Sequence, residues 1–591
     1  MERYVSILGL VVMVGIAWLI SNNRKAINWR LVASGIILQV VIGAFILLTP
    51  KEGTLTGPGA GGLLIGLAGA GIGLYYLART RKVAPGWVGF WWFFSALLTF
   101  LIGMKAKGGV AEHGDLGAWM SGIAIVLILI PIARRLFKDQ LQKRFGEKLK
   151  LDAFQTFVVC GVAAPLIVGG MALGYGLDSY HMSFDFFGMT RDIVAAILGF
   201  SDQGAKFIFG DGFQEHFFAF SVLPTIIFVS SLTAVLFHLG VLQAVVRFLA
   251  KIMVKLLDVS GSESLAASAN VFVGQTEAPL IIKPYLPTMT QSELMAMMTG
   301  GMATVAGGVM AAYAGLGADP GHLLTASVMS APASLILAKI MIPETEESPT
   351  KGLVKVDVPK QDANVLDAAC RGAGEGLHLA LNVAAMLIAF IALMALLNAG
   401  LKLMGTFESE YLGLTGGAEP NTGPLTFEAL LGGLMRPMAW LMGVEWADTG
   451  RVGTLLGIKT IVNEFVAYLS LAGDITGNVP AGVKPLSDRS ILISTYALCG
   501  FANFSSIAIQ IGGIGALVPE RRKDFAKIGL RAMVGGTLAA FMTATVAGML
   551  LSDDQITEMA DENRARLGIE KPADKGDVEG DADPKADPMA E

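Results

Sequence analysis

The sequence predicts an all-α, polytopic membrane protein, and three observations carry this prediction. Of the 591 residues, 53% are apolar and only 16% are charged, whereas a soluble domain has about 25% charged residues. The mean hydropathy is +0.60. Apolar stretches of about 20 residues, the length that a helix needs to cross a bilayer, recur along the chain, with basic residues gathered in the loops between them.

The apolar stretches give the expected membrane spans in chain order. They are 5–21, 31–49, 59–78, 87–104, 117–136, 154–175, 217–240, 292–317, 321–342, 378–404, 487–517 and 527–551. The first has its basic residues mostly behind it and no small-residue cleavage site after it. We therefore expect a retained span with an outside N-terminus, not a signal peptide.

Two further apolar segments, 259–287 and 450–472, are interrupted midway by polar residues, Gly or Pro. We expect both to be re-entrant hairpins that do not cross. With that layout every basic loop falls on the cytoplasmic side, as the positive-inside rule requires. These loops are 22–30, 79–86, 134–150, 241–258, 343–376 and 520–527. Had either hairpin crossed, the basic loops after it would switch sides.

The hairpins also mark a repeat. The first precedes spans 292–317 and 321–342, and the second precedes spans 487–517 and 527–551. The two units have opposite orientations, which predicts an inverted repeat of the kind found in secondary transporters, with substrate and ion near the midplane where the hairpin tips meet.

This layout divides the chain into seven expected units. They are 1–50 (two spans), 51–175 (about four additional peripheral spans), 176–258 (an extracytoplasmic segment, a scaffold span and a cytoplasmic interfacial helix), 259–342 (first repeat), 343–450 (cytoplasmic linker, scaffold span and outer interfacial helix), 451–551 (second repeat) and 552–591. The last unit is rich in Asp, Glu, Ala and Pro, and we expect it to be disordered and extracytoplasmic.

The first hairpin carries Glu277 beside Gln275 and Thr276. A carboxylate in a membrane segment is costly and is usually functional. Together these side chains offer an amide, a hydroxyl and a carboxylate, which match the donors and acceptors at the edge of a heterocyclic base. The alternative is that Glu277 only pairs with a lysine such as Lys283 to hold the hairpin.

The second hairpin carries Glu464 between Asn463 and Phe465. A carboxylate can accept two hydrogen bonds from a vicinal diol, as on ribose. The alternative is a structural salt bridge to Lys459 or to a basic residue on another span.

Two of the expected spans contain helix-breaking runs. In 487–517, Gly500 and small polar residues predict a break that exposes Asn503, Ser505 and Ser506, although serines of this kind are more typical of helix packing when taken alone. In 292–317, Gly307 and Gly308 predict unwinding near Thr304. Freed carbonyls and a hydroxyl suit Na⁺, and glycine for close helix packing is an equal alternative.

No enzyme or pump machinery is visible. The three cysteines and six histidines are dispersed, and the sequence has no HExxH, Walker A or GxSxG motif. The basic run 134–150 is expected to face lipid head groups, not nucleic acid.

Several motifs resemble the concentrative nucleoside transporter family. They are Gly274-Gln-Thr-Glu-Ala-Pro279, Val462-Asn-Glu-Phe-Val-Ala-Tyr468, Gly500-Phe-Ala-Asn-Phe-Ser-Ser506 and Ile509-Gln-Ile-Gly-Gly-Ile-Gly-Ala-Leu-Val-Pro-Glu-Arg-Arg522. The resemblance covers about 201–342 and 375–550, and returns at 5–49 with Asn28-Trp-Arg30. The departure is 50–175, where about four extra spans intervene and for which no function is assigned.

The resemblance implies a homotrimer that moves nucleosides by an elevator motion driven by a cation gradient. It implies a substrate site in which Gln275, Thr276 and Glu277 face the base, Val309 is an apolar wall, Glu464, Asn503 and Ser506 hold the ribose hydroxyls, and Phe501 lies nearby. It also implies a sodium site at Asn270, Val273, Thr304 and Val305, partly through backbone carbonyls. Members of the family often carry Ser where Thr304 stands, and Thr keeps the hydroxyl.

The expected function is therefore sodium-coupled nucleoside import across a bacterial-type inner membrane by a multi-pass protein that binds nucleoside, sodium and lipid. Proton coupling through Glu277 or Glu464 is the alternative within this class. A channel or a nucleoside-sensing receptor is the alternative from another class. The sequence leaves open the preferred base, the ion stoichiometry and the role of the acidic tail.

Overall fold

The computed structural model describes residues 2–47, 186–216, 220, 222–352, 362–403, 426–479 and 483–569. Within these ranges the regular secondary structure is helical throughout, as the sequence predicts. The α-helices are α1 (Glu2–Leu19), α2 (Trp29–Leu47), α9 (Phe186–Phe209), α10 (Leu223–His238), α11 (Val241–Leu257), α12 (Gly261–Asn270), α13 (Ala278–Ile281), α14 (Gln291–Ala303), α15 (Gly307–Gly315), α16 (Pro320–Met341), α17 (Val365–Leu403), α18 (Phe427–Leu441), α19 (Thr449–Ile461), α20 (Glu464–Thr476), α21 (Asp488–Leu498), α22 (Phe504–Leu517), α23 (Arg522–Leu550) and α24 (Asp553–Arg566). The expected additional spans within 51–175 lie outside the described residues.

Among the described residues, three helical stretches are long and apolar enough to cross a membrane: Gln291–Gly315, Pro320–Met341 and Pro519–Leu550. A fourth results if α10 and α11, which meet at an angle of 74°, count as one bent span. The three stretches are 89%, 89% and 83% buried inside the protein over their most apolar windows. They therefore form the core of the molecule instead of a lipid-facing shell.

The order of elements repeats along the chain. The pair α12–α13, the broken helix α14–α15 and the long helix α16 are followed later by the pair α19–α20, the broken helix α21–α22 and the long helix α23. Both breaks were expected from the sequence. The first lies at 304–306, and Gly307 and Gly308 begin α15 instead of being unwound, which corrects the expected place of unwinding.

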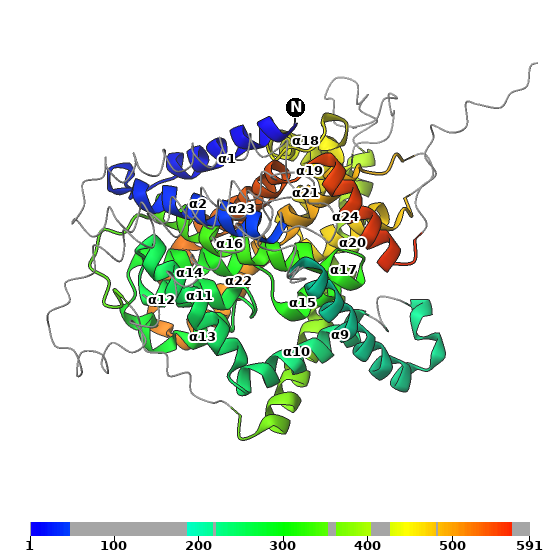
Figure 1. Ribbon diagram of the computed structural model, residues 1–591, viewed down its shortest axis with the longest axis horizontal. Helices are drawn as coiled ribbons and strands as arrows, with labels where there is room; N and C mark the ends of the chain where they lie inside the picture. The colour runs from blue at the N-terminus through cyan, green and yellow to red at the C-terminus, as the bar shows by residue number, and fades with distance from the viewer. Residues whose placement is uncertain are drawn as a thin grey trace, which may run out of the picture.

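The two repeats pack into one body. Helix α23 contacts α14, α16, α21 and α22, and α14 contacts α12 and α16. In Figure 1, α1 and α2 lie along the upper edge against α16 and α23, whereas α9, α10 and α17 lie at the lower right. Helix α10 connects α17 to the first repeat because it packs on both α17 and α15.

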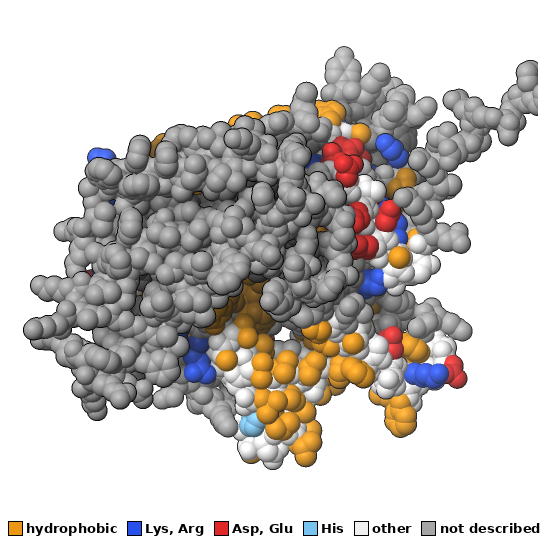
Figure 2. Space-filling model, in the orientation of Figure 1, with side chains coloured by type: hydrophobic (Ala, Val, Ile, Leu, Met, Phe, Trp, Pro, Cys, Tyr) orange, Lys and Arg blue, Asp and Glu red, His pale blue; other side chains and the backbone are white. Residues whose placement is uncertain are grey.

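An apolar surface covers the lower part of the view in Figure 2, where Figure 1 places α10 and α17. Helix α17 has large exposed apolar side chains, among them Ile388 (74% exposed) and Leu396 (69% exposed). On α9, Phe207 is 91% exposed. Exposed apolar area on this scale is typical of contact with lipid or with another chain.

Two described segments differ from expectation. The stretch 176–216, for which the sequence predicted a location outside the cytoplasm but no helix, contains the 24-residue helix α9. The tail, expected to be disordered from Ser552 onward, begins with helix α24. Ser552 and Gln555 form a capping box that starts α24, and Ile556 (1% exposed) and Met559 (8% exposed) anchor it to the core.

Candidate functional site

Five buried side chains from four parts of the chain form one hydrogen-bonded group, here called the tip cluster. It consists of Gln275, Tyr313, Glu464, Asn503 and Ser506. Gln275 Nε2 donates to Ser506 Oγ (3.1 Å), and Ser506 N donates to Asn503 Oδ1 (2.9 Å). Asn503 Nδ2 donates to Glu464 Oε2 (3.0 Å), and Tyr313 OH donates to Glu464 Oε1 (2.9 Å). The tips of both expected hairpins and the break between α21 and α22 are thus connected.

Helix caps place three of these residues. Asn463 caps α20 by accepting from Val466 N (2.9 Å), so Glu464 is the first residue of that helix. Asn503 caps α22 in the same way by accepting from Ser506 N. Helix N-termini carry unpaired N–H groups and partial positive charge. A buried carboxylate and an anionic or oxygen-rich ligand are both favoured at this position.

Glu464 is 5% exposed, and each of its carboxylate oxygens accepts a side-chain hydrogen bond. The sequence left open a salt bridge between Glu464 and Lys459. The ion pairs of the described residues do not include this pair. Lys459 is fully buried and donates instead to the carbonyl oxygen of Ala497 (2.7 Å), near the end of α21. A carboxylate oxygen has two lone-pair sites, so Glu464 retains acceptor capacity for a ligand.

The other polar residues of the first hairpin lie beside the tip cluster. Thr276 Oγ1 donates to Glu277 Oε1 (3.1 Å), and the Glu277 side chain is exposed. A side chain at Gly274 would collide with the Glu277 carboxylate. The described ion pairs do not join Glu277 to Lys283, so the alternative of a hairpin-stabilising pair is not realised. A Cβ at Gly513 would lie 2.8 Å from Thr276 Cγ2, which shows that Thr276 rests on α22.

The expected sodium residues surround the break of α14–α15. Asn270 is 1% exposed, and neither Oδ1 nor Nδ2 has a hydrogen-bond partner. Thr304 Oγ1 donates to Gly300 O (3.0 Å), and a Cβ at Gly300 would lie 3.3 Å from Asn270 Nδ2. Val273 and Val305 are both buried. A buried, unpartnered amide oxygen fits a hard cation such as Na⁺.

The remaining expected residues lie between these groups. Phe501 N donates to Thr304 O (3.2 Å), so the two helix breaks are hydrogen-bonded to each other. Val309 is 4% exposed and lies one turn before Tyr313 in α15. The structure thus gathers the expected base, ribose and sodium residues around two adjoining breaks.

Sequence reasoning missed two buried residues that contact this region, Tyr313 and Gln510, and it named Lys459 only as a possible salt-bridge partner of Glu464. Gln510 Nε2 donates to Gln275 Oε1 (3.0 Å) and to Met298 O (3.1 Å). Helical register holds a signal for both missed residues, because residues four apart share a helix face. Tyr313 is four residues after Val309, and Gln510 is four after Ser506.

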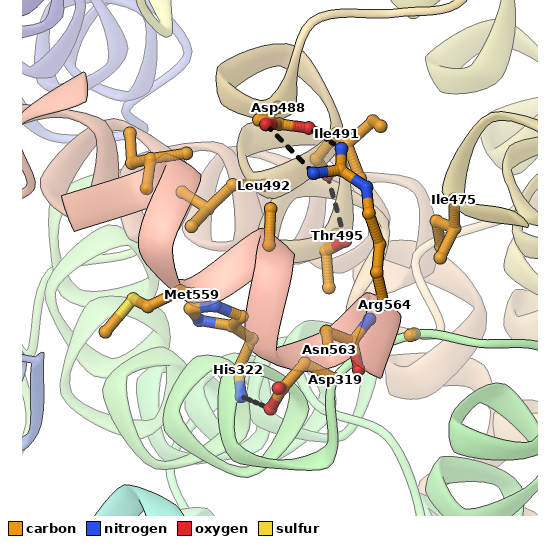
Figure 3. A pocket seen from close by; sticks show the side chains of 13 residues that line it. Asp319, His322, Ile475, Asp488, Ile491, Leu492, Thr495, Met559, Asn563 and Arg564 are labelled. Atoms are coloured by element: carbon orange, nitrogen blue, oxygen red, sulfur yellow. Dashed lines mark hydrogen bonds and ion pairs between the residues drawn. The ribbon is translucent and has the colours of Figure 1, made fainter. Parts of the chain in front are cut away.

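A separate cavity of about 50 Å³ lies between α16, α21 and α24. Figure 3 shows Arg564 of α24 reaching Asp488, and Asp319 beside the backbone of His322. Ligand sites are usually about 300–1,000 Å³, so this cavity is too small for a nucleoside. None of the tip-cluster residues lines it.

Three family models match the chain. They are the N-terminus of Na⁺ dependent nucleoside transporters (residues 8–54), a nucleoside recognition or gate region (residues 219–320) and the C-terminus of Na⁺ dependent nucleoside transporters (residues 322–548). The matched ranges leave out residues 55–218, which hold nearly all of the inserted segment, and include every residue of the tip cluster.

Named relatives match about two thirds or more of the chain. An uncharacterized transporter of Haemophilus influenzae is 43% identical over 65% of this chain and 91% of its own length. The sodium/nucleoside cotransporter 1 of Rattus norvegicus is 41% identical over 77% of this chain and 72% of its own length. The human solute carrier family 28 member 3 is 42% identical over 67% of this chain. The chain spans only about half of that relative's length, 56%.

Solved structures of CNTnw are also similar. The inward-facing, substrate-bound state has a TM-score of 0.63 at 30% identity, and the comparison covers 93% of this chain and 98% of CNTnw. An outward-facing state of a doubly substituted CNTnw gives a TM-score of 0.62 over the same shares.

Proposed function

The chain belongs to the concentrative nucleoside transporter family, and from that premise we propose that it is a sodium-coupled nucleoside importer. The observation that carries the proposal is the tip cluster. It joins Gln275 of the first hairpin to Glu464 of the second through Ser506 and Asn503. A ligand bound there contacts both repeats at once, as an alternating-access carrier requires.

The two halves of the cluster suit the two halves of a nucleoside. Gln275, Thr276 and Glu277 offer donors and acceptors to the base, with Val309 as an apolar wall. The ribose side of the site consists of Glu464, Asn503 and Ser506, with Phe501 nearby. Glu464 accepts hydrogen bonds from ribose hydroxyls, and because its charge is buried, those hydrogen bonds are strong.

Sodium is the proposed coupling ion. The matching family models describe Na⁺ dependent transporters, and Asn270 keeps a buried, unpartnered amide oxygen. The ion would be held by Asn270 and Thr304, with the backbone at Val273 and Val305. Its charge would balance the buried Glu464 and would join the first hairpin to the break of α14–α15. This gives a physical reason for sodium to promote nucleoside binding.

Alternating access would follow from movement of the two repeats as one unit against α9, α10, α17 and the N-terminal helices. CNTnw has been solved in inward-facing, intermediate and outward-facing states, which supports an elevator motion in this family. The exposed apolar surface on α17 suits a scaffold that contacts lipid and two further copies in a homotrimer. We place the protein in the bacterial inner membrane, with the basic loops in the cytoplasm and α24 outside.

The replacement of Glu464 by Gln tests the ribose role. This change keeps the side-chain shape and removes the charge, so uridine uptake into proteoliposomes under a sodium gradient should fall to background while the purified protein keeps its oligomeric state. Glu558→Gln, at an exposed position on α24, is the matched control and should transport normally. Near-normal uridine uptake by Glu464→Gln would refute the proposed role.

Uptake with and without sodium at fixed pH separates sodium coupling from proton coupling. Loss of concentrative uptake in sodium-free buffer supports the sodium proposal. Undiminished uptake that follows an imposed proton gradient would replace it with the proton mechanism.

A further inference from the structure

Gln510 is a fully buried side chain on α22 to which the proposed function gives no role. Its amide nitrogen donates two hydrogen bonds, one to the backbone oxygen of Met298 (3.1 Å) and one to Gln275 Oε1 (3.0 Å). Its own Oε1 has no hydrogen-bond partner. Both N–H groups of this amide are therefore used to fix neighbours of the substrate site.

These contacts fix the orientation of two amides. A backbone carbonyl oxygen only accepts hydrogen bonds, so Gln510 must present its nitrogen to Met298. That nitrogen also faces Gln275, which must therefore present its oxygen to Gln510. If either amide were rotated by half a turn, two donors or two acceptors would face each other in a buried site, at a large energetic cost.

The orientation leaves Gln275 with a defined polarity. Its oxygen is engaged by Gln510, and one N–H of its Nε2 is engaged by Ser506 Oγ (3.1 Å). A primary amide nitrogen carries two N–H groups. The second N–H is therefore the group that Gln275 can offer to a ligand.

Gly301 of α14 makes the room for this arrangement. A Cβ at Gly301 would lie 2.8 Å from Gln510 Nε2 and 3.0 Å from Gln275 Cβ. Both distances are shorter than ordinary van der Waals contact, so any larger residue would push the two amides apart. The close approach of α14 and α22 therefore helps to hold the amides of Gln275 and Gln510 together.

We propose that Gln510 is a positioning residue that makes Gln275 a hydrogen-bond donor toward the nucleobase. The inference rests on the proposed function, in which Gln275 faces the base. It adds that the site prefers bases with an acceptor at that edge. Uridine and cytidine are the natural probes, because one ring position carries a carbonyl acceptor in uridine and an amino donor in cytidine.

The test is the Gln510→Met variant, which keeps the length of the side chain and removes both hydrogen bonds. Gln275 is then free to rotate and to present either end of its amide. The KM for uridine should rise about three- to tenfold, the effect of one lost hydrogen bond. The ratio of the KM values for cytidine and uridine should move toward one, while the maximal rate changes less.

Gln39→Met is the matched control. Gln39 is also fully buried, donates to Thr543 Oγ1 (3.1 Å) and has an unpartnered Oε1, but it lies between α2 and α23. A general cost of losing a buried glutamine should affect both variants equally and leave the cytidine-to-uridine ratio unchanged.

If Gln510→Met fails to fold, Gly301→Ala perturbs the same pair of amides from the other side and should shift the same ratio. An unchanged ratio in the folded variant, with wild-type protein that transports both nucleosides, would overturn this inference alone. Absence of nucleoside uptake by the wild-type protein would instead overturn the proposed function.

Discussion

Glu464 shows how single side chains set the chemistry of the site. Its two oxygens accept from Tyr313 on α15 and Asn503 at the start of α22. A buried carboxylate that loses one of its donors is left poorly solvated, and this costs more than an ordinary hydrogen bond contributes. Tyr313 is itself held by stacking on Tyr468, with ring centroids 4.2 Å apart. The position of Glu464 therefore depends on a residue that belongs to the other repeat.

Replacement of Tyr313 by Phe tests this dependence. The ring and its stacking remain, but Glu464 loses one donor, and hydrogen bonds to charged groups contribute about 1.5–3 kcal/mol. We expect the KM for uridine to rise by about tenfold or more. Tyr468→Phe is the control, because the Tyr468 hydroxyl donates to the backbone at Thr495 (2.6 Å) instead. Equal KM values for the two variants would contradict the assigned role of Tyr313.

Asn270→Ala tests the sodium residues without a transport assay. Because the Asn270 amide has no hydrogen-bond partner in the fold, its removal should cost little stability in sodium-free buffer. A ligand at about 100 times its Kd stabilises a protein by about 2.7 kcal/mol, so sodium should raise the Tm of the wild-type protein but not of the variant.

Asn563→Ala is the control for that experiment. Asn563 donates to Gly317 O (2.9 Å) beneath α24, so the variant should lose stability and keep the sodium-induced rise in Tm. A full sodium effect on the Tm of Asn270→Ala would remove Asn270 from the proposed ion site.

The sequence predicted the site residues that lie at helix breaks, but not those that lie inside continuous helices. Glu464 and Asn503 are polar residues beside breaks in apolar segments, and the structure brings them together with Gln275 and Ser506. Tyr313 and Gln510 lie inside continuous helices, where no break marks them. Only their helical register relates them to Val309 and Ser506, and register does not reveal which distant side chain they meet.

At the scale of elements, the two helix breaks act as a unit. Phe501 N donates to Thr304 O (3.2 Å), and a Cβ at Gly500 would lie 3.0 Å from the backbone oxygens of both Met302 and Ala303. Glycine is required because the backbones approach too closely for a side chain. The broken helices of the two repeats therefore contact each other directly beside the tip cluster.

Gly500→Ala should separate the breaks by a few tenths of an ångström and displace both Phe501 and Thr304. We expect lower uridine uptake and a higher sodium concentration for half-maximal uptake, because the ribose-side and ion-side residues share this contact. Gly512→Ala on the same broken helix has open space around it and should leave both quantities unchanged. Wild-type sodium dependence in Gly500→Ala would show that the contact between the breaks does not couple the sites.

The sequence predicted both breaks and both interrupted segments because Gly, Pro and capping Asn residues have strong local effects. It did not predict α24. The charged composition of the tail dominates any average over that segment, and in α24 only Ile556 and Met559 are buried apolar residues. A capping box at Ser552 was the local signal for a helix. Packing against α21 then stabilises a helix that composition alone would leave disordered.

At the scale of the whole molecule, the repeated order of elements explains why one site can contact both repeats. The most apolar stretches of the long helices α16 and α23 are 89% and 83% buried, and the hairpins and broken helices pack around them. The sequence predicted this order from hydropathy and the basic loops. The sequence did not predict the contacts between the repeats, because they join residues such as Gln275 and Ser506, which are 231 positions apart.

The most direct measurement is the accumulation of radiolabelled uridine by proteoliposomes that contain the purified full-length protein under an inward sodium gradient. We expect the internal uridine concentration to exceed the external concentration and the excess to collapse when the sodium gradient is dissipated. Uridine that equilibrates without exceeding the external concentration, or that does not enter at all, would contradict sodium-coupled nucleoside transport.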